Sequence, residues 1–311
     1  MIFNQIAGGG ESVKEPYIQW SVVDGAMVND SARKIDLRNT NVSTIKPYQL
    51  YSLYRNNTAV SGEFDFGALM QIEESGMERF LDGCVNIQSV NCGDIVSVKT
   101  KGLKWALVRT GINEVSFDNL YTVEPFALQE ICSGCGSLSI VKFPVLSMVF
   151  NDSLGVYQYS GANNALTGAF GGSSVSEIYF DNLPVPASTD TPSDVNGCFG
   201  SNTMLLGCSN VTIHFPKRLE QYVNTNIASL PNFSNGFGGT NITILFDRIT
   251  KITRDNSTEY NVAQKTGDYW IWQQVGNPYN QVYTSPNPSV GDNVYGNSIL
   301  TGVVGTIIAV A

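Results

Sequence analysis

The chain has 311 residues, of which 42% are hydrophobic, so it is long enough to bury a large core spread over two or three units. It carries 18 Lys and Arg against 27 Asp and Glu, a formal net charge of −9, and it contains no run rich in Lys or Arg. This balance argues against nucleic acid and anionic membranes as partners. Charged residues make up 14% of the chain, while Asn, Ser, Thr, Gly and Tyr are abundant, which favours a β-rich structural or binding protein over a cytosolic enzyme.

The two ends of the sequence bear on secretion and membrane insertion. Residues 1–10 have neither a basic start nor an apolar segment of leader length, so we expect no cleaved secretion leader. The apolar run at 299–311 is broken by Gly302 and Gly305 and is far shorter than the roughly 20 residues that span a bilayer. We therefore expect no membrane insertion.

The first 33 residues differ in pattern from the rest of the chain. Residues 17–23 and 26–28 read as two strands joined by a turn at Asp24 and Gly25, which predicts a small hairpin. We expect 1–33 to form an N-terminal anchor or cap.

Residues 34–248 carry a repeating apolar pattern. A large apolar residue, most often Phe, returns every 25 to 37 residues, a branched apolar residue usually precedes it by two positions, and Asp or Pro usually follows it. The large residue is one of Leu37, Phe64, Cys92, Phe117, Phe143, Phe180, Phe215 and Phe246. Such intervals are typical of stacked repeats, in which each unit buries its apolar face against its neighbours.

One repeat unit shows the expected local structure. The step from Val141 to Phe143 places both side chains on one face of a strand, with Lys142 pointing outward. In other units an apolar group such as Met77, Phe80 and Leu81 has the spacing of a single helical turn. We therefore expect each coil to combine a short strand with a short helical arc.

The segments 83–90 and 134–141 both read Gly-Cys, then an apolar residue three positions on, then Val. This pattern resembles the BspA-like leucine-rich repeats. The resemblance covers roughly 34–248 and implies a β-rich leucine-rich-repeat solenoid with short helical arcs. Proteins with this repeat look like surface adhesins of gut bacteria, or like fibre and decoration proteins of phages that infect them, such as crAss-like phages.

Two insertions lengthen the later coils, at 151–164 and 184–197. They are rich in Tyr, Ser, Gly, Asn, Pro and Asp, a composition that suits adaptable binding loops, although surface loops also vary in length without any function. Insertions at one point of a coil project from one face of the stack. The candidate binding residues in these loops are Tyr157, Tyr159, Asn163, Asp190 and Asp194.

The period ends after Arg248. Residues 252–262 read as a hairpin and 269–272 as an aromatic strand, and further short strands with Gly turns follow near 291–296 and 301–308. We expect 249–311 to form a small separate all-β domain, whose last strands offer edges for pairing between chains.

The sequence offers little catalytic chemistry. The single histidine, His214, falls at an outward strand position, and Cys132 and Cys135 form a C-x-x-C without a second such pair or a nearby His. The six cysteines suit a role as small buried hydrophobic residues. The pairs Glu73 with Glu74, and Asp255 with Glu259, carry no defined separation. We predict no catalytic, cofactor-binding or metal-binding residues and no cofactor.

The leading hypothesis is a non-enzymatic phage virion protein, a head or tail fibre-like decoration. It would contact other virion proteins through its N-terminal region, present its repeats to a host surface protein or glycan, and assemble as a homo-oligomer. The alternative is a secreted bacterial leucine-rich-repeat adhesin located at the cell surface, and a glycan-cleaving enzyme on a fibre is a third reading.

Overall fold

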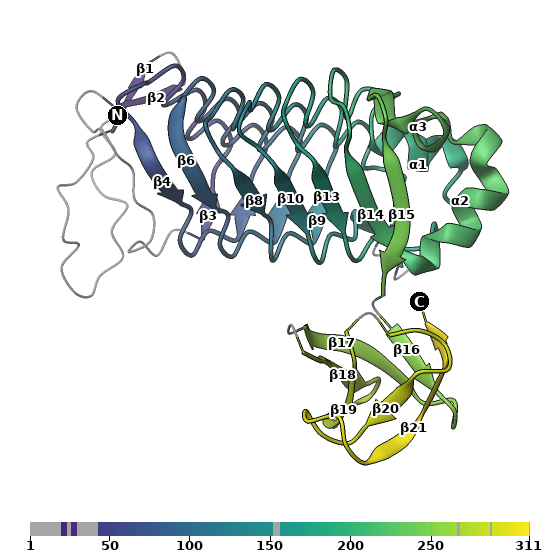
Figure 1. Cartoon of the computed structure of the whole chain (residues 1–311). Helices are drawn as coiled ribbons and strands as arrows, with labels where there is room; N and C mark the ends of the chain where they lie inside the picture. The colour runs from purple at the N-terminus through teal and green to yellow at the C-terminus, as the bar shows by residue number, and fades with distance from the viewer. Residues whose placement is uncertain are drawn as a thin grey trace, which may run out of the picture.

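The computed structural model describes residues 20–23, 26–29, 43–151, 156–249, 251–265, 268–286 and 288–310. The chain winds through a stack of coils and then forms a small barrel (Figure 1). Near the N-terminus, β1 (Trp20–Val23) and β2 (Ala26–Asn29) pair antiparallel as the predicted hairpin requires. Residues 17–19 of that hairpin and the predicted repeat position at Leu37 lie outside the described residues.

The stack is built on two parallel sheets. The larger sheet has the order β15-β14-β13-β10-β8-β6-β4, and the smaller has the order β3-β5-β7-β9. The seven strands of the larger sheet are β4 (Ser61–Asp65), β6 (Asn86–Asn91), β8 (Glu114–Ser116), β10 (Ile140–Phe143), β13 (Glu177–Phe180), β14 (Thr212–Pro216) and β15 (Thr243–Arg248). The four strands of the smaller sheet are β3 (Thr44–Ile45), β5 (Gln71–Ile72), β7 (Ser97–Val98) and β9 (Thr122–Val123).

Turn segments, here called arcs, lead from the small sheet back to the large one. The four regular arcs span 47–56, 74–83, 100–109 and 125–134. Every fourth residue of the third arc has a left-handed backbone, with φ of 58° at Lys101, 58° at Trp105 and 56° at Arg109. Alternate N–H groups along the arc reach the next coil, as from Leu103 to the carbonyl of Ala127 at 3.0 Å and from Trp105 to that of Gln129 at 2.9 Å. The arcs are therefore hydrogen-bonded to one another and are not helical, because a right-handed helix needs negative φ throughout.

The predicted fold class, a leucine-rich-repeat solenoid with short helical arcs and a small all-β domain, is corrected by the structure. The described residues form parallel sheets joined by non-helical arcs, together with a closed six-stranded antiparallel barrel, and helices are scarce. The physical reason lies in the arcs. The apolar spacing at Met77, Phe80 and Leu81 suits a helix, but Ser75 and Arg79 have φ of 51° and 59°, which a helix excludes.

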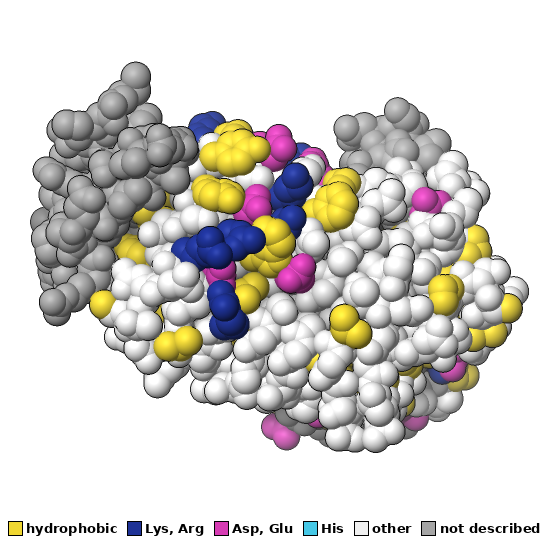
Figure 2. All heavy atoms as spheres, turned by 90° about the horizontal axis from the view of Figure 1, so that it is seen from above, with side chains coloured by type: hydrophobic (Ala, Val, Ile, Leu, Met, Phe, Trp, Pro, Cys, Tyr) yellow, Lys and Arg dark blue, Asp and Glu magenta, His cyan; other side chains and the backbone are white. Residues whose placement is uncertain are grey.

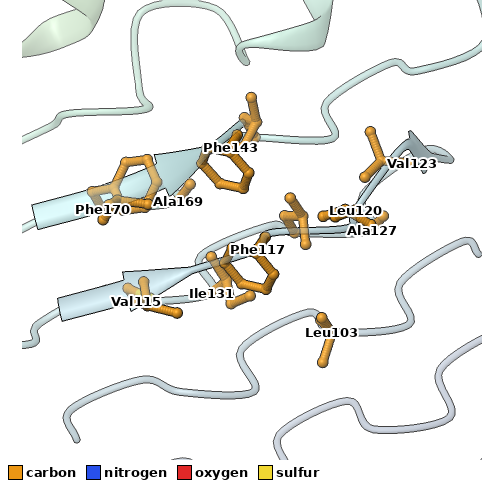
Figure 3. Close-up of a cluster of buried hydrophobic side chains, with 14 of the residues drawn as sticks. Leu103, Val115, Phe117, Leu120, Val123, Ala127, Ile131, Phe143, Ala169 and Phe170 are labelled. Atoms are coloured by element: carbon orange, nitrogen blue, oxygen red, sulfur yellow. The ribbon is translucent and has the colours of Figure 1, made fainter. Parts of the chain in front are cut away.

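A continuous core fills the space between the two sheets and the arcs. Phe117, Phe143, Phe180 and Phe215 lie in register on neighbouring strands, and their rings stack with centroids 5.2, 5.1 and 5.4 Å apart in that order. This spacing follows from the roughly 4.8 Å between adjacent strands, which places equivalent side chains directly over one another. Figure 3 shows Phe117 and Phe143 among arc side chains such as Ile131.

The predicted repeat register is confirmed for most strands and wrong for the first. Val115 pairs with both Val90 and Val141, as the repeat predicts. The repeat pattern aligned Phe64 with Cys92, but Phe64 pairs with Val90. Phe66 therefore lies opposite Cys92 and takes the place of the large residue in this coil. Phe64 and Phe66 share one face of the strand and Asp65 follows Phe64, so the sequence pattern selected Phe64 and misplaced this coil by two residues.

Short helices gather at the C-terminal end of the stack (Figure 1). They are α1 (Pro192–Cys198), α2 (Glu220–Asn226) and α3 (Pro231–Ser234), with 3-10 turns η1 (Lys217–Leu219), η2 (Ile227–Ser229) and η3 (Gly236–Gly238). Val223 and Phe233 are buried against the core from this segment. The helices therefore cover apolar surface where the regular coils end. Two further strands, β11 (Val149–Asn151) and β12 (Val156–Gln158), form a hairpin in the first insertion.

The C-terminal part is a closed antiparallel barrel with the order β16-β17-β18-β19-β20-β21. Its strands are β16 (Lys251–Arg254), β17 (Glu259–Lys265), β18 (Trp270–Gln274), β19 (Asn277–Thr284), β20 (Asn293–Tyr295) and β21 (Val303–Val310). Trp272 fills its core, and its indole N–H donates to Thr284 Oγ1 at 2.8 Å. Because β21 pairs with both β16 and β20, its two edges are engaged within the barrel. The free edges expected of these strands are therefore taken up inside the barrel, and pairing between chains stays a prediction.

The predicted boundary at Arg248 coincides with the end of β15, and the barrel begins at Lys251. Across the described residues, no helix combines the length and the apolar character needed to cross a bilayer.

Candidate functional site

The two insertions expected to bind a ligand are tied together by one carboxylate. Asp190 accepts the backbone N–H of Ser160 at 2.9 Å and of Tyr159 at 3.1 Å, and it also accepts the N–H of Ala187 at 2.9 Å. The Tyr159 ring is fully buried, its hydroxyl donates to the carbonyl of Pro184 at 2.9 Å, and burial raises its pKa well above the usual value. Asp190 and Tyr159 therefore hold the insertions in place.

The other three predicted binding residues are dispersed around this junction. Asp194 closes a capping box at the start of α1, where its backbone N–H and its carboxylate both bond to Thr191. Asn163 is exposed, and its carbonyl accepts the N–H of Phe126 at 3.2 Å. Tyr157 lies opposite Phe150 in β12, and its side chain lies outside the described part of the structure. A binding role for these residues stays a prediction.

His214 faces outward from β14, as expected, but its ring is engaged by neighbours. It stacks on Tyr179 of β13 with centroids 4.4 Å apart, and its Nδ1 lies 2.8 Å from the carboxylate of Asp247 in β15. Only 13% of the side chain is exposed. The ring therefore bridges three neighbouring strands on the outer face of the sheet.

The C-x-x-C cysteines lie in the core. All six cysteines are free and buried, which confirms their predicted role as core residues. The Cys135 thiol donates to the carbonyl of Leu107 in the preceding coil at 3.1 Å, and the Cys208 thiol donates to that of Phe170 at 2.9 Å. Burial raises the pKa of Cys92, so this thiol is held in its neutral form. A thiol at these places satisfies a buried carbonyl between coils.

The carboxylate pairs considered in the sequence serve separate partners. Asp255 accepts the N–H of Thr306 at 3.0 Å, while Glu259 pairs with Lys251 at 3.0 Å. Within the described ranges, no three His, Cys, Asp or Glu side chains come close enough together to hold a metal ion.

A cluster of arginines on the arcs was missed by sequence reasoning. Asp82 accepts Arg109 Nη2 at 2.7 Å and Arg55 Nε at 3.1 Å, and Arg79 Nη1 lies 3.6 Å away. These four residues, here called the arginine cluster, come from three successive coils. Only 4% of the Asp82 side chain is exposed, against 44% for Arg55 and 56% for Arg109. One carboxylate compensates one charge, so the cluster presents an excess of positive charge to solvent.

Trp105 extends the arginine cluster along the third arc. Its ring lies 3.9 Å from the Arg79 guanidinium carbon and 4.0 Å from Lys104 Nζ, both within cation–π range. Burial lowers the pKa of Lys104. The nearby carboxylates of Glu78 and Glu130 oppose this shift, while the cations Lys101 and Arg79 add to it. The indole therefore holds two cations close together.

The arc geometry explains why these side chains meet. Arg79, Trp105 and Arg109 all occupy left-handed positions, and the backbone N–H of each donates to a carbonyl of the next coil. Arg55 and Arg109 each lie 27 residues from Asp82 in the sequence, which is one coil in either direction. That separation matches the repeat interval, so the spacing of Arg55, Asp82 and Arg109 in the sequence could have predicted the cluster.

The charge is concentrated at one end of the arc face. The four regular arcs contain five basic and four acidic residues, while the later turn segments at 163–172 and 199–207 contain no charged residue. Figure 2, a view from above, shows Lys and Arg gathered beside hydrophobic side chains, with Asp and Glu side chains among them, over the N-terminal part of the stack. Tyr48 of the first arc is 49% exposed, and its ring lies 6.2 Å from that of Tyr51. The arc face thus combines cations with exposed aromatic rings.

Comparison with protein-family models, with curated proteins and with solved structures found no match for this chain.

Proposed function

We propose that this protein is a non-enzymatic attachment protein that binds a surface ligand through its arc face. The observation that carries the proposal is the arginine cluster, in which three guanidinium groups surround one carboxylate that is almost fully buried. Structural ion pairs need one cation for each carboxylate, and the excess positive charge here is exposed. An exposed excess of one sign attracts ligands of the opposite sign.

The stacked coils support this proposal because they hold the binding groups rigidly. Each regular arc is fixed to its neighbour by backbone hydrogen bonds, such as that from Trp105 to Gln129 at 2.9 Å. The side chains of three coils therefore keep their relative positions before a ligand arrives. Such preorganisation lowers the entropic cost of binding.

The biological setting remains the one expected from the sequence. We place the protein on a phage particle, as a head or tail fibre-like component that contacts other virion proteins through residues 1–33 and forms a homo-oligomer. The arc face would then point toward a host surface. Antibody labelling of intact phage particles tests the location, and light scattering of the purified chain tests the oligomeric state.

Adsorption of the fluorescently labelled protein to a panel of gut bacterial cells tests the attachment function. We expect saturable adsorption to some members of the panel. It should fall at least tenfold in the double variant Arg55→Glu and Arg109→Glu. The control variant, Lys142→Glu with Lys251→Glu, changes the net charge equally at half-exposed side chains elsewhere. A lack of adsorption across the panel, or equal losses in both variants, would contradict the proposal.

A further inference from the structure

We infer that the ligand of the arc face is an anionic polysaccharide whose charges are carboxylates, that is, a polymer containing uronic acids. This inference rests on the proposed attachment function and names its ligand class. Its starting point is the arginine cluster, because a guanidinium group matches the two oxygens of a carboxylate through parallel N–H donors. Arg55 and Arg109 each make one close contact with Asp82, and about half of each side chain is exposed to solvent.

The arrangement along the stack fits a polymer with repeating charges. Adjacent coils are separated by roughly 4.8 Å, so the backbones of Arg55 and Arg109, two coils apart, lie about 10 Å apart along the stack. Their guanidinium groups converge on Asp82 in the coil between them. Arg79 lies on the coil between these positions, and Trp105 contacts both Arg79 and Lys104, which lies on the same coil as Arg109. An extended chain lying along the stack would meet several cations in succession, and its affinity would grow with the number of contacts.

The groups between the cations suit sugars better than nucleic acid. The exposed Glu74 places a carboxylate on the same arcs, where it can accept hydroxyl donors but repels closely spaced phosphates. A polysaccharide with one carboxylate per sugar also carries several hydroxyl groups beside each charge. The exposed ring of Tyr48 adds an apolar surface on the first arc, which also carries Arg55 of the arginine cluster.

An acidic peptide is the closest competing ligand, because it also carries carboxylates. Its side chains are flexible and would lose rotamer entropy when held on a rigid surface. Ring-bound carboxylates of a uronic acid are already fixed relative to the polymer. The repeating coil spacing therefore favours the stiffer chain.

Titrations of the whole protein with defined polymers test this inference. The probes are polygalacturonate and alginate, the methyl ester of polygalacturonate as the uncharged match, poly-L-glutamate, and single-stranded poly(dT). We expect at least one uronate polymer to bind at least tenfold more tightly than the methyl ester, poly-L-glutamate and poly(dT). That binding should weaken as salt is raised.

Variants connect the binding to the arginine cluster. We expect Arg55→Gln with Arg109→Gln to weaken uronate binding at least tenfold, and Lys104→Gln to weaken it severalfold. Lys142→Gln with Lys251→Gln should leave it unchanged. Arg79 stays near Asp82 in the first variant, and a thermal melt confirms that each variant is folded.

The possible outcomes separate the two proposals. The ligand class is overturned if neither uronate polymer binds, if poly-L-glutamate or poly(dT) binds as tightly, or if the arginine variants bind normally. If cell adsorption nevertheless depends on Arg55 and Arg109, attachment through the arc face stands and only its ligand is misassigned. If both the adsorption and the polymer binding are absent, both proposals fail.

Discussion

Arg109 and Asp82 form an ion pair of 2.7 Å between neighbouring coils, with the carboxylate buried and the guanidinium half exposed. Such a pair has two roles at once. The buried end fixes the arcs to each other, and the exposed end is available to a ligand. The two roles can be separated by changing one residue at a time.

Replacement of Asp82 by Asn should destabilise the stack. The change removes the charge that compensates Arg55, Arg79 and Arg109, and it leaves their repulsion uncompensated. We expect a loss of about 1–3 kcal/mol in the free energy of unfolding, measured by urea denaturation at pH 7. Glu114→Gln is the control, since Glu114 pairs with Lys142 where both side chains are half exposed, and it should cost less than about 1 kcal/mol. Equal costs for the two variants would show that Asp82 has no special role.

Truncation of Phe143 should be among the most damaging single changes. Its ring is fully buried and stacked between Phe117 at 5.2 Å and Phe180 at 5.1 Å. We expect Phe143→Ala to cost about 3–5 kcal/mol, because it removes the ring and leaves a cavity between coils. Phe143→Leu should cost distinctly less, because it fills part of that space. Chemical denaturation of both variants measures the difference, and a cost below about 1 kcal/mol for Phe143→Ala would contradict the stacked core.

The junction between the insertions can be tested at Asp190. Its carboxylate oxygens accept N–H groups from Tyr159, Ser160 and Ala187, and an amide in its place offers one oxygen and turns a donor toward those N–H groups. We expect Asp190→Asn to destabilise the protein by about 1–2 kcal/mol and to raise hydrogen exchange at 158–162.

Asp194→Asn is the comparison for that change. It affects only the cap of α1, and the expected cost is about 1 kcal/mol, with faster exchange confined to 192–198. If Asp190→Asn left exchange at Ser160 unaltered, the proposed link between the insertions would be wrong.

The sequence predicted the repeating strands because their signal is local and periodic. Val115, Val141 and Ile178 recur in identical surroundings, and the structure pairs them on neighbouring strands. The coil at Phe64 was misplaced because Phe64 and Phe66 are both Phe on one face of the strand, and Asp65 after Phe64 completes the repeat pattern. The choice between two such residues depends on the neighbouring strand and is not visible in one segment.

The arcs were mispredicted because apolar spacing reports which side chains face inward and not the path of the backbone. Positions three and four apart can share a face in a helix and also in a chain that turns through left-handed residues. Trp105 and Arg109 carry no intrinsic preference for positive φ, so only hydrogen bonding to the next coil reveals their conformation. The arginine cluster shares this cause, because its members meet only when the coils are stacked.

The Cys84 thiol predicts how the stability of the protein changes at alkaline pH. Burial raises its pKa from 9.0 to about 11, helped by the nearby charge of Asp82, and its Sγ–H donates to the carbonyl of Tyr54 at 3.0 Å. The folded chain therefore keeps this proton to a higher pH than the unfolded chain does. The stabilisation is fully present below pH 9 and is lost as the pH rises toward 11.

The variant Cys84→Ser isolates this effect, because a hydroxyl keeps the donor to Tyr54 and does not ionise in this range. At pH 7 we expect the variant to be less stable by about 1 kcal/mol. Between about pH 9 and 10.5 the wild type should lose stability relative to the variant, so the difference between them narrows. Urea denaturation at a series of pH values measures this difference in the free energy of unfolding. In the folded protein, the Cys84 thiol should react slowly with iodoacetamide at pH 8. A stability difference that widens with pH, or rapid alkylation of Cys84, would show that the folded state does not protect the Cys84 proton.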